Sequence, residues 1–420
     1  MNHLEVFIEL WDNAGTAFPE PGRIYSQNEQ KQKERHLRQL IGQLKSHNGQ
    51  EIKNPDALID KEFFKSLKDF FKNVMDYSED QLNMIFSDQM LSSTFGFITA
   101  AVKFDPDLPM QSIFQACRNV WIMNGVQLLL GEKVSLSPSV FAYSMLYPYT
   151  DNFIDDPCVT NYQKAEFSQR FAKRLNGDKI APENPVEVKI FNLVGMIEKE
   201  WDRDLYPGVY RSLQAIHSAQ TKSMELINHT GDERLSSRQA LVICADKGGT
   251  SVVADGYLVK GDLDSSLEGF LFIYGAYLQL LDDLQDLDED AGNGLMTCFY
   301  IASLEGGIDS SINKLYRLGE DVVLMMKRAG IDNEQFAGLI KKSFHLFIIG
   351  SVITGQRFFC RKYISAFHKH YPLDPEYIIR QKQNSEKYQE LLFNKISEFA
   401  LSANTIPEWV SHGANFLPVT

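Results

Sequence analysis

A run of acidic residues directly follows an apolar, helix-forming stretch in the second half of the chain. Residues 277–294 read YLQLLDDLQDLDEDAGNG, and the carboxylates of this run are Asp282, Asp283, Asp286, Asp288, Glu289 and Asp290. Residues four apart lie one above the other on a helix, so Asp282, Asp286 and Asp290 are predicted to line one face. Like charges at this spacing repel, and acids near a helix C-terminus oppose the macrodipole. A bound Mg²⁺ would offset both the repulsion and the unfavourable interaction with the helix dipole, because it binds carboxylate oxygens and leaves room for phosphates. The alternative is an acidic helix end that is exposed to solvent.

A second acidic cluster lies upstream, in the sequence YTDNFIDDP of residues 149–157. Asp151 and Asp155 are four apart and share a helical face, and the stretch before them is again apolar and aromatic. A helical bundle can bring two such helix ends together across a cavity. We therefore predict a site in which several Mg²⁺ ions, acting as Lewis acids, hold a highly charged anion, most naturally a diphosphate. The predicted metal ligands are Asp151, Asp155, Asp282, Asp283, Asp286 and Asp290, and the predicted catalytic residues are Asp151, Asp155, Asp282 and Asp286.

Four basic residues are candidates for binding the diphosphate: Lys247, Arg357, Arg361 and Arg118. Lys247 precedes Gly248-Gly249, and a glycine pair inside a helix predicts a break, since each glycine costs about 1 kcal/mol relative to alanine. Broken backbone beside a lysine can present N–H groups to a phosphate. The alternatives are a surface lysine, a solvated arginine pair, and a structural ion pair for Arg118. Asp255, eight residues after Lys247, is either a further acidic contact or a partner for a lysine.

The remaining pattern predicts an all-α protein. Helical periodicity runs through 90–104, 112–130, 140–151, 210–228, 236–260, 270–281, 312–328, 333–370 and 375–403, and no stretch shows convincing strand alternation. Loops are expected at 105–109 and 176–185, and Gly292 to Gly294 should end the acidic helix. We expect a bundle of ten or more helices around a central apolar cavity. Residues 1–88 are predicted to be a helical extension that packs on the main body, residues 89–420.

The composition of the chain argues against several classes of function. The chain has 420 residues, 44% hydrophobic and 23% charged, which is typical of a globular protein with a large core. A net charge of −13 without a long basic stretch argues against a nucleic-acid partner. Five scattered cysteines disfavour a disulfide framework. The N-terminus does not resemble a signal peptide and the apolar runs are short, so we expect a cytoplasmic protein without a transmembrane segment.

The two acidic motifs resemble those of the class I isoprenoid synthases. The stretch from Gln279 to Asp286, QLLDDLQD, is similar to the second DDxxD motif of trans-prenyl diphosphate synthases, including its glutamine. It also resembles the phytoene and squalene synthase motif, except that Gln285 replaces an arginine and the later Gly-Arg-x-Tyr is absent, which disfavours head-to-head condensation. The segments DNFID (151–155) and KGGTSVVADGYLV (247–259) look most like the bacterial large-terpene synthases of the tetraprenyl-β-curcumene synthase type. The resemblance covers about residues 90–365.

This resemblance implies a class I isoprenoid synthase-like bundle with a cluster of three Mg²⁺ ions that removes diphosphate from an allylic carbon. The resulting carbocation would be steered inside an apolar, aromatic pocket that excludes water, where aromatic faces stabilise positive charge. The predicted cavity-lining residues are Tyr147, Phe153, His217, Gln220, Tyr274 and Gln279; ordinary core packing is the alternative for the aromatic residues, and a satisfied core histidine is the alternative for His217.

The function expected from the sequence is that of a Mg²⁺-dependent terpene synthase, a carbon–oxygen lyase acting on an acyclic polyprenyl diphosphate. The alternatives are a prenyltransferase that joins isoprenoid diphosphates and a non-catalytic helical homologue that only binds metal. A long prenyl substrate makes transient membrane contact plausible, although the chain shows no clear basic amphipathic helix.

Overall fold

The computed structural model describes the backbone of residues 2–46, 58–155, 158–227, 235–382, 385–403 and 407–411. Within these ranges the side chains of residues 44–46, 58–62, 151, 152, 154, 155, 385, 386, 403, 408 and 411 are not described. No residue of the described ranges lies in a β-strand, so the all-α prediction is confirmed.

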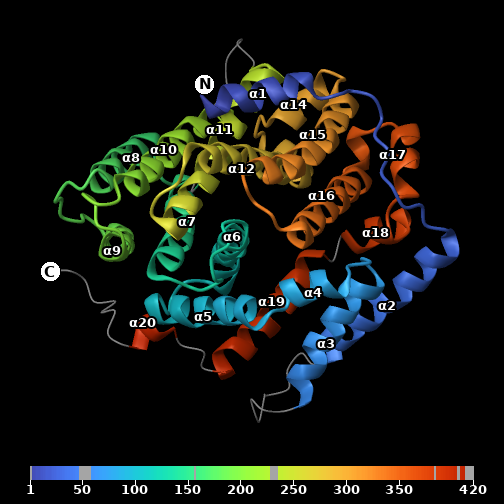
Figure 1. Ribbon diagram of the computed structural model, residues 1–420, viewed down its shortest axis with the longest axis horizontal. Coiled ribbons are helices and arrows are strands. Elements are labelled where there is room, and N and C mark those ends of the chain that lie inside the picture. Colours follow the sequence, from blue (N-terminus) through green and yellow to red (C-terminus); the bar gives the residue numbers. More distant parts are fainter. Residues whose placement is uncertain are drawn as a thin grey trace.

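The helices follow one another along the whole chain (Figure 1). They are α1 (His3–Asn13), α2 (Gln27–Ser46), α3 (Leu58–Asn73), α4 (Glu79–Ile85), α5 (Asp88–Phe104), α6 (Met110–Leu129), α7 (Pro138–Asp155), α8 (Asn161–Leu175), α9 (Pro185–Glu200), α10 (Pro207–Ser223), α11 (Ser237–Lys260), α12 (Ser265–Gln285), α13 (Leu287–Asn293), α14 (Cys298–Leu304), α15 (Ile308–Arg328), α16 (Glu334–Thr354), α17 (Arg361–His368), α18 (Pro375–Lys382), α19 (Ser385–Ala403) and α20 (Glu408–Ser411), with the 3₁₀ turns η1 (Met224–Leu226) and η2 (Gln356–Phe358).

Helices α11 and α12 form the centre of the fold, and most other helices pack around this pair (Figure 1). On one side α10 and α6 pack against α11, and α7 packs against α6, α9 and α11. On the other side α15 and α16 pack against α12. Helix α1 lies across α11, α12 and α15, while α5 and α19 close the opposite end of the bundle. The space between α6, α7, α10, α11 and α12 is where the predicted site residues meet.

The glycine pair of α11 is a packing device and not a helix break. Helix α11 runs without interruption from Ser237 to Lys260, so the predicted break at Gly248-Gly249 is wrong. A Cβ on Gly248 would lie 2.6 Å from the carbonyl oxygen of Gly275 and would collide with Gln279, and a Cβ on Gly249 would lie 2.6 Å from the Phe272 ring. The missing side chains let the backbones of α11 and α12 approach closely. This contact outweighs the lower helix propensity of glycine.

The acidic run bends at Asp286 and does not continue as one straight helix. Helix α12 ends at Gln285, Asp286 lies between the two helices with φ −92° and ψ 8°, and α13 begins at Leu287. Hydrogen bonds of helical spacing bridge the junction, because the N–H of Asp286 donates to the carbonyl of Asp282 (2.9 Å) and that of Asp290 donates to Asp286 (2.8 Å). Gly294 ends α13 in the left-handed conformation (φ 72°), as predicted for a helix-ending glycine.

The C-terminal third is divided more finely than its periodicity predicts. The helical pattern over 333–370 is interrupted after Thr354, because Gly355 starts a 3₁₀ turn and Phe359 is extended (φ −117°, ψ 148°). Helix α16 has the length and composition of a membrane-spanning helix, with 21 residues. Half of its most apolar window is buried inside the protein, and α12, α15, α17 and α18 pack against it. Packing in the core therefore accounts for its apolar sequence.

The N-terminal helices pack on the rest of the protein at two separate places. Helix α1 contacts the central pair, with Phe7 fully buried. Helices α2, α3 and α4 pack on one another, and they reach the main body through contacts of α2 with α19 and of α4 with α16. Gln30 of α2 also donates a hydrogen bond to the carbonyl of Tyr371 (3.0 Å). The division of the chain at residue 88 stays a prediction.

A buried carboxylate fixes α7, which carries the upstream acidic motif. Asp105, in the turn between α5 and α6, accepts hydrogen bonds from the Tyr149 hydroxyl of α7 (2.6 Å) and from Lys189 of α9 (2.5 Å). Burial acts to raise the pKa of Asp105, but these two hydrogen bonds and the positive charge of Lys189 outweigh it and hold the pKa below its usual value. The ionised carboxylate is thus the stabilising form.

We expect Asp105→Asn to lower the free energy of unfolding by about 1–3 kcal/mol at neutral pH, because it leaves a buried lysine contact without its charge partner. A carboxyl with a depressed folded pKa stabilises the protein above its unfolded pKa and loses this contribution as the pH falls through the folded value. Denaturant unfolding at pH 7 and at successively more acidic pH should therefore show the two proteins converging below about pH 4. A difference that does not change with pH would contradict the assignment.

A second prediction concerns the α11–α12 contact. Gly248→Ala should destabilise the protein by about 1–3 kcal/mol, because the added methyl group meets the backbone of α12. Gly42→Ala, in exposed α2 with nothing within 4 Å of the added Cβ, is the matched control and should stabilise by about 0.5–1 kcal/mol. Thermal unfolding of both variants measures the contrast, and equal effects would argue against a packing role for Gly248.

Candidate functional site

A cavity of about 290 Å³ lies between α6, α7, α8, α10, α11 and α12. Much of its wall is apolar and comes from Ile122, Leu146, Phe167, Phe171, Leu213 and Ile216. The charged side chains of the lining are those of Arg118, Lys247 and Asp282, and Arg118 forms an ion pair with Asp282. The cavity therefore combines an apolar interior with one charged end, which is the arrangement expected for a ligand that has an apolar body and a charged head.

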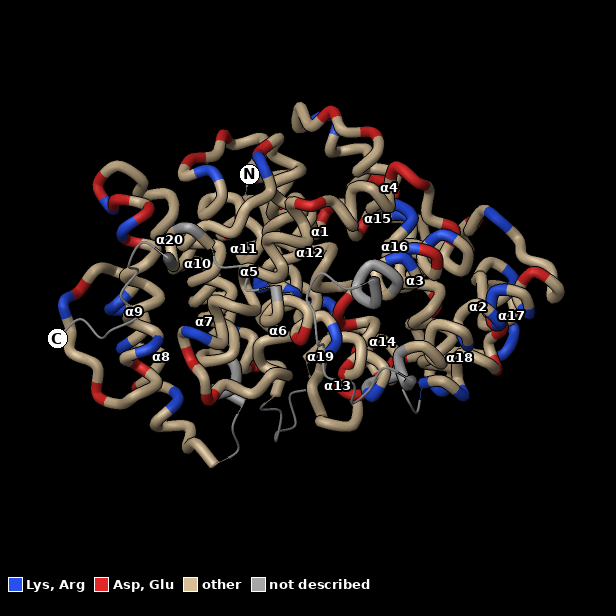
Figure 2. The backbone as a smooth tube through the Cα atoms, turned by 90° about the horizontal axis from the view of Figure 1, so that it is seen from below, with Lys and Arg blue, Asp and Glu red and all other residues tan. Residues whose placement is uncertain are grey.

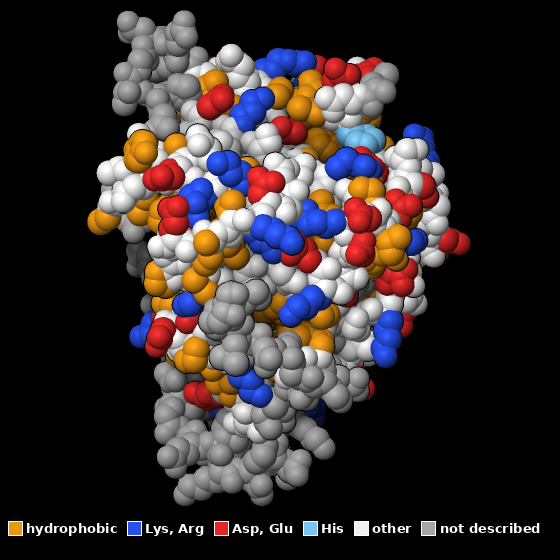
Figure 3. Space-filling model, turned by 90° about the vertical axis from the view of Figure 1, so that its left-hand side faces the viewer, with side chains coloured by type: hydrophobic (Ala, Val, Ile, Leu, Met, Phe, Trp, Pro, Cys, Tyr) orange, Lys and Arg blue, Asp and Glu red, His pale blue; other side chains and the backbone are white. Residues whose placement is uncertain are grey.

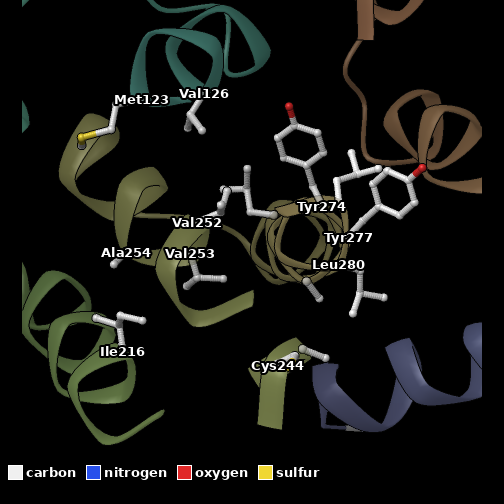
Figure 4. Close-up of a cluster of buried hydrophobic side chains, with 14 of the residues drawn as sticks. Met123, Val126, Ile216, Cys244, Val252, Val253, Ala254, Tyr274, Tyr277 and Leu280 are labelled. Atoms are coloured by element: carbon white, nitrogen blue, oxygen red, sulfur yellow. The ribbon is translucent and has the colours of Figure 1, made fainter. Parts of the chain in front are cut away.

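Four of the six predicted lining residues line this cavity, namely Tyr147, His217, Gln220 and Gln279. Phe153 and Tyr274 lie outside the lining. The ring of Phe153 packs behind the wall, 4.6 Å from the ring of Phe167. Tyr274 is buried on the side of α12 that faces α16, where its ring contacts Phe344 (6.4 Å). Figure 4 shows Tyr274 extending from α12 away from Val253 and Ile216.

His217 is a wall residue held in place by α8. Its Nε2 lies 3.0 Å from the carbonyl oxygen of Ser168, and its ring packs edge-on against Phe171 at 5.0 Å. Burial lowers the pKa of His217, which keeps the ring neutral, so Nε2–H donates to that carbonyl. The alternative of a satisfied core histidine thus describes its hydrogen bonding, although the ring also lines the cavity.

The first two carboxylates of the acidic run occupy different environments. Asp282 faces the cavity and pairs with Arg118 of α6 at 3.0 Å, with both side chains about half exposed. Asp283 is buried, and its Oδ1 accepts a hydrogen bond from Gln279 (2.8 Å) while its Oδ2 has no partner among the described residues. Burial, opposed by this hydrogen bond, raises the pKa of Asp283 to about 6. A buried carboxylate oxygen without a partner fits a position beside a cation.

The next two carboxylates repel their neighbours. Desolvation and the negative charge of Asp282 raise the pKa of Asp286 to about 6. Desolvation, followed by the charges of Asp283 and Asp286, raises the pKa of Asp290 to about 8, although Thr297 donates a hydrogen bond to it (3.2 Å). This crowding is the destabilising arrangement that the sequence predicts, and a divalent cation would relieve it.

The residues present fit a Mg²⁺ site only in an open form. In the part of the chain that the structure describes, no three acidic, histidine or cysteine side chains converge closely enough to hold a metal by themselves. Mg²⁺ commonly uses one or two carboxylates together with waters and substrate phosphates. Asp151 and Asp155 belong to the last turns of α7, which lines the cavity through Tyr147 and Thr150, but their side chains lie outside the described residues.

The structure separates the four basic candidates into two groups. Arg118 and Lys247 line the cavity. Arg357 instead pairs with Asp288 of α13 at 2.7 Å and donates to its backbone carbonyl at 3.1 Å, and Lys382 pairs with the same carboxylate. Arg361 begins α17 and is exposed. Figure 2 shows acidic α13 flanked by basic segments, so Asp288 anchors the C-terminal helices to the acidic run.

Several site residues carry no motif that sequence reasoning could detect. Cys244 of α11 and Cys298 of α14 are buried beside Asp283, and burial together with contacts between these groups raises the pKa of both thiols. They are 54 positions apart in the sequence, so no spacing rule relates them. Asn119 and Ser251 also line the cavity. Of these residues, only Ser251 could have been found from the sequence, because its spacing of four residues from Lys247 predicts that the two share a helical face.

Replacing one of the crowded carboxylates should weaken metal binding and increase the thermal stability of the metal-free protein. We expect Asp290→Asn to raise the Tm without Mg²⁺ at a pH above the Asp290 pKa of about 8, where the wild-type carboxyl is ionised, because it removes like-charge repulsion while the amide oxygen can still accept from Thr297. In the wild type, Mg²⁺ with pyrophosphate should stabilise by about 2.7 kcal/mol at a hundredfold excess over the Kd, and the variant should lose most of this gain. Asp288→Asn is the matched control, which should lose stability with its ion pairs and keep the Mg²⁺ response. Thermal unfolding with and without Mg²⁺ measures all three, and a full Mg²⁺ response in Asp290→Asn would contradict the assignment.

Comparisons with known proteins do not indicate a function, so the evidence for an activity comes from the site itself. No protein-family model matches the chain, and no curated protein matches its sequence. The argument for an activity therefore depends on the side chains that meet at the charged end of the cavity. These are Arg118 and Asp282, which form an ion pair between α6 and α12, and Lys247, whose charge acts on buried Asp283.

Proposed function

We propose that this protein is a Mg²⁺-dependent class I terpene synthase that ionises an acyclic polyprenyl diphosphate and converts the carbocation to a linear or cyclic terpene. The observation that carries the proposal is the placement of crowded carboxylates at one end of an apolar cavity. Asp282 lines the cavity, Asp283 and Asp290 of the same acidic run are buried, and Phe167 and Phe171 contribute to the apolar part of the lining.

The charged end suits a diphosphate because it offers both signs of charge. Bound Mg²⁺ would supply Lewis-acid neutralisation of the leaving diphosphate. Arg118 and Lys247 lie in the same lining and can donate to phosphate oxygens, and the planar guanidinium suits a bidentate contact. The Arg118–Asp282 ion pair holds both groups at the cavity end before a ligand binds. A diphosphate would compete with Asp282 for this arginine.

The apolar part suits a prenyl chain and a short-lived cation. A prenyl chain that fills the cavity would displace water, which would otherwise quench the cation. Phe167, Phe171 and Tyr143 contribute aromatic faces to the lining, and such faces attract positive charge. The resemblance of QLLDDLQD and DNFID to the paired motifs of class I isoprenoid synthases is consistent with the proposal. A cytoplasmic location and transient membrane contact belong to the same proposal.

The first experiment measures pyrophosphate release from prenyl diphosphates of increasing length with Mg²⁺, with and without isopentenyl diphosphate, and identifies the extracted products. We expect release from a single substrate with a hydrocarbon or alcohol product. Release that requires a second isoprenoid diphosphate and yields a joined or longer product would identify a prenyltransferase. No release from any substrate would favour a metal-binding homologue without turnover.

Variants test the residues once turnover is measured. Asp286→Ala and Asp151→Ala should each lower kcat/KM by about 100-fold or more, because each removes charge that positions the metal ions and the leaving group. Asp178→Ala, an exposed acid in the loop between α8 and α9, is the control and should leave turnover unchanged. Unchanged turnover in Asp286→Ala and Asp151→Ala would contradict the proposal. Both variants should be checked for an unaltered thermal transition.

Interspersed surface charge is consistent with a small-molecule function. Figure 3 shows positive and negative side chains mixed over the described part of the face nearest α8 and α9. With a net charge of −13, this pattern gives a polyanion such as nucleic acid little long-range attraction. A diphosphate in the cavity is different, because Arg118 and Lys247 lie in the lining itself.

A further inference from the structure

His217 is the only histidine among the described residues that line the cavity. It lies on α10 near Leu213 and Ile216, which line the cavity as well, and the ring of Phe171 from α8 packs edge-on against it at 5.0 Å. The imidazole is thus placed among apolar side chains of the lining, where a hydrocarbon chain would lie. What it can do there depends on which of its two nitrogens carries a proton.

The hydrogen bonds around the ring place this proton on Nε2. Nε2 lies 3.0 Å from the carbonyl oxygen of Ser168, which can only accept. The hydroxyl of Thr221 donates to the backbone carbonyl of His217 (2.9 Å), so the Ser168 hydroxyl donates its own proton to Thr221 Oγ1 (3.2 Å). A lone pair of Ser168 Oγ then faces Nε2 at 3.3 Å. Because both neighbours of Nε2 are acceptors, Nε2 carries the hydrogen.

The other ring nitrogen, Nδ1, is therefore an unprotonated base. Burial lowers the pKa of His217, and the hydrogen bond to Ser168 offsets this only in part, so the ring is neutral at pH 7. In the described part of the chain, all hydrogen bonds of the ring involve Nε2. Nδ1 is also not one of the sealed buried atoms that lack a partner. It is thus reachable from the cavity that the ring lines.

No other group in the described lining offers a neutral nitrogen base. Lys247 and Arg118 are cations, and the carboxylate of Asp282 is paired with Arg118. The remaining polar side chains of the lining carry amides and hydroxyls, which are much weaker bases than imidazole. The apolar part of the cavity therefore contains one group that can accept a proton readily.

We propose that Nδ1 of His217 accepts the proton that ends the reaction, so that the product is an alkene. This role rests on the proposed function, in which loss of diphosphate leaves a carbocation in the cavity. The electron pair of a C–H bond next to the cationic carbon forms the new C=C bond, and the proton passes to Nδ1. The positive charge moves to the ring. The released diphosphate then takes the proton and leaves as hydrogen diphosphate, which restores the neutral imidazole.

Ser168 is the positioning residue for this step. Its carbonyl fixes the Nε2–H form of the ring before the cation arises. After the transfer, Nε2–H belongs to an imidazolium and makes a stronger, charge-assisted hydrogen bond to the same carbonyl. The low pKa of His217 does not oppose the transfer, because a carbocation is a far stronger acid than an imidazolium. It also keeps Nδ1 free of a proton until the cation forms.

His217→Gln separates this role from a structural one. The glutamine amide can still donate to the Ser168 carbonyl, but it places no basic nitrogen in the cavity. The amount of alkene formed per pyrophosphate released should fall about tenfold or more, in favour of an alcohol or of isomers formed by other bases. A purely structural histidine would lower both quantities together and leave their ratio unchanged.

His345→Gln is the matched control for the product ratio. Burial lowers the pKa of His345 to about 4, so this ring is also neutral, but it stacks on Tyr316 and is not among the described residues of the lining. The ratio of alkene to pyrophosphate should therefore stay at the wild-type value in this variant.

A measurement on the wild type without turnover tests the position of the proton. ¹⁵N NMR of the histidine rings in the full-length protein should show His217 with hydrogen on Nε2 and an unprotonated Nδ1. Prenyl alcohols of increasing length serve as cavity probes, and one that fits should shift the Nδ1 signal of His217 and leave the ring of His345 unchanged. Loss of the signal in His217→Gln identifies it.

The results distinguish the role of His217 from the proposed function. A wild type that releases no pyrophosphate from any prenyl diphosphate contradicts the proposed function and the proton transfer with it. Pyrophosphate release with an alcohol as the sole product, or with an unchanged alkene ratio in His217→Gln, overturns the role of His217 alone. A protonated Nδ1, or ring signals that no probe moves, overturns it as well, even where the variant does not fold.

Discussion

The close approach of α11 and α12 is the contact on which the site depends. Gly248 and Gly275 face each other across this contact, and a Cβ on Gly275 would collide with the carbonyl of Gly248. Because the two backbones lie so close, Lys247 of α11 is placed beside the carboxylates at the end of α12. A wider separation would open the charged end and remove the influence of Lys247 on Asp283. The contact between α11 and α12 therefore determines both the packing of the two helices and the distance between Lys247 and the carboxylates of α12.

The close spacing of the carboxylates is energetically unfavourable, and it is located at the charged end of the cavity. Asp283, Asp286 and Asp290 have raised pKa values because they are desolvated and lie near other carboxylates, and Arg118, which pairs with Asp282, offsets this only in part at Asp286. The bundle tolerates this cost because it has a large apolar core, part of which Figure 4 shows. Sites that bind cations or perform chemistry commonly carry such a local conflict, and the rest of the fold compensates for it.

Much of the fold could be predicted from the sequence, because helical periodicity is a local property. Breaker residues also gave correct ends, as at Asp105 and Gly294. The glycine pair could not be interpreted locally, since the reason for Gly248 is the backbone of α12, 27 positions away at Gly275. Arg357 is a second residue whose role could not be predicted from local sequence. Its helical spacing from Arg361 suggested a shared role, but the chain turns between them and Arg357 pairs with Asp288. Long-range contacts decide such cases, and a single sequence does not contain them.

The buried carboxyls of Asp283 and Asp255 illustrate why position, and not residue type, decides chemistry. Asp283 lies among other acids and near Lys247, so a nearby cation would favour its ionised form. Asp255 lies eight residues from that lysine on the same helix, but it is fully buried and does not belong to the cavity lining. Burial outweighs the hydrogen bond from Asn119 and raises the pKa of Asp255 well above its usual value, so its carboxyl is neutral at pH 7. One helix thus carries a cation in the cavity lining and a neutral acid in the core, and the surroundings of each group decide which of them can act on a charged ligand.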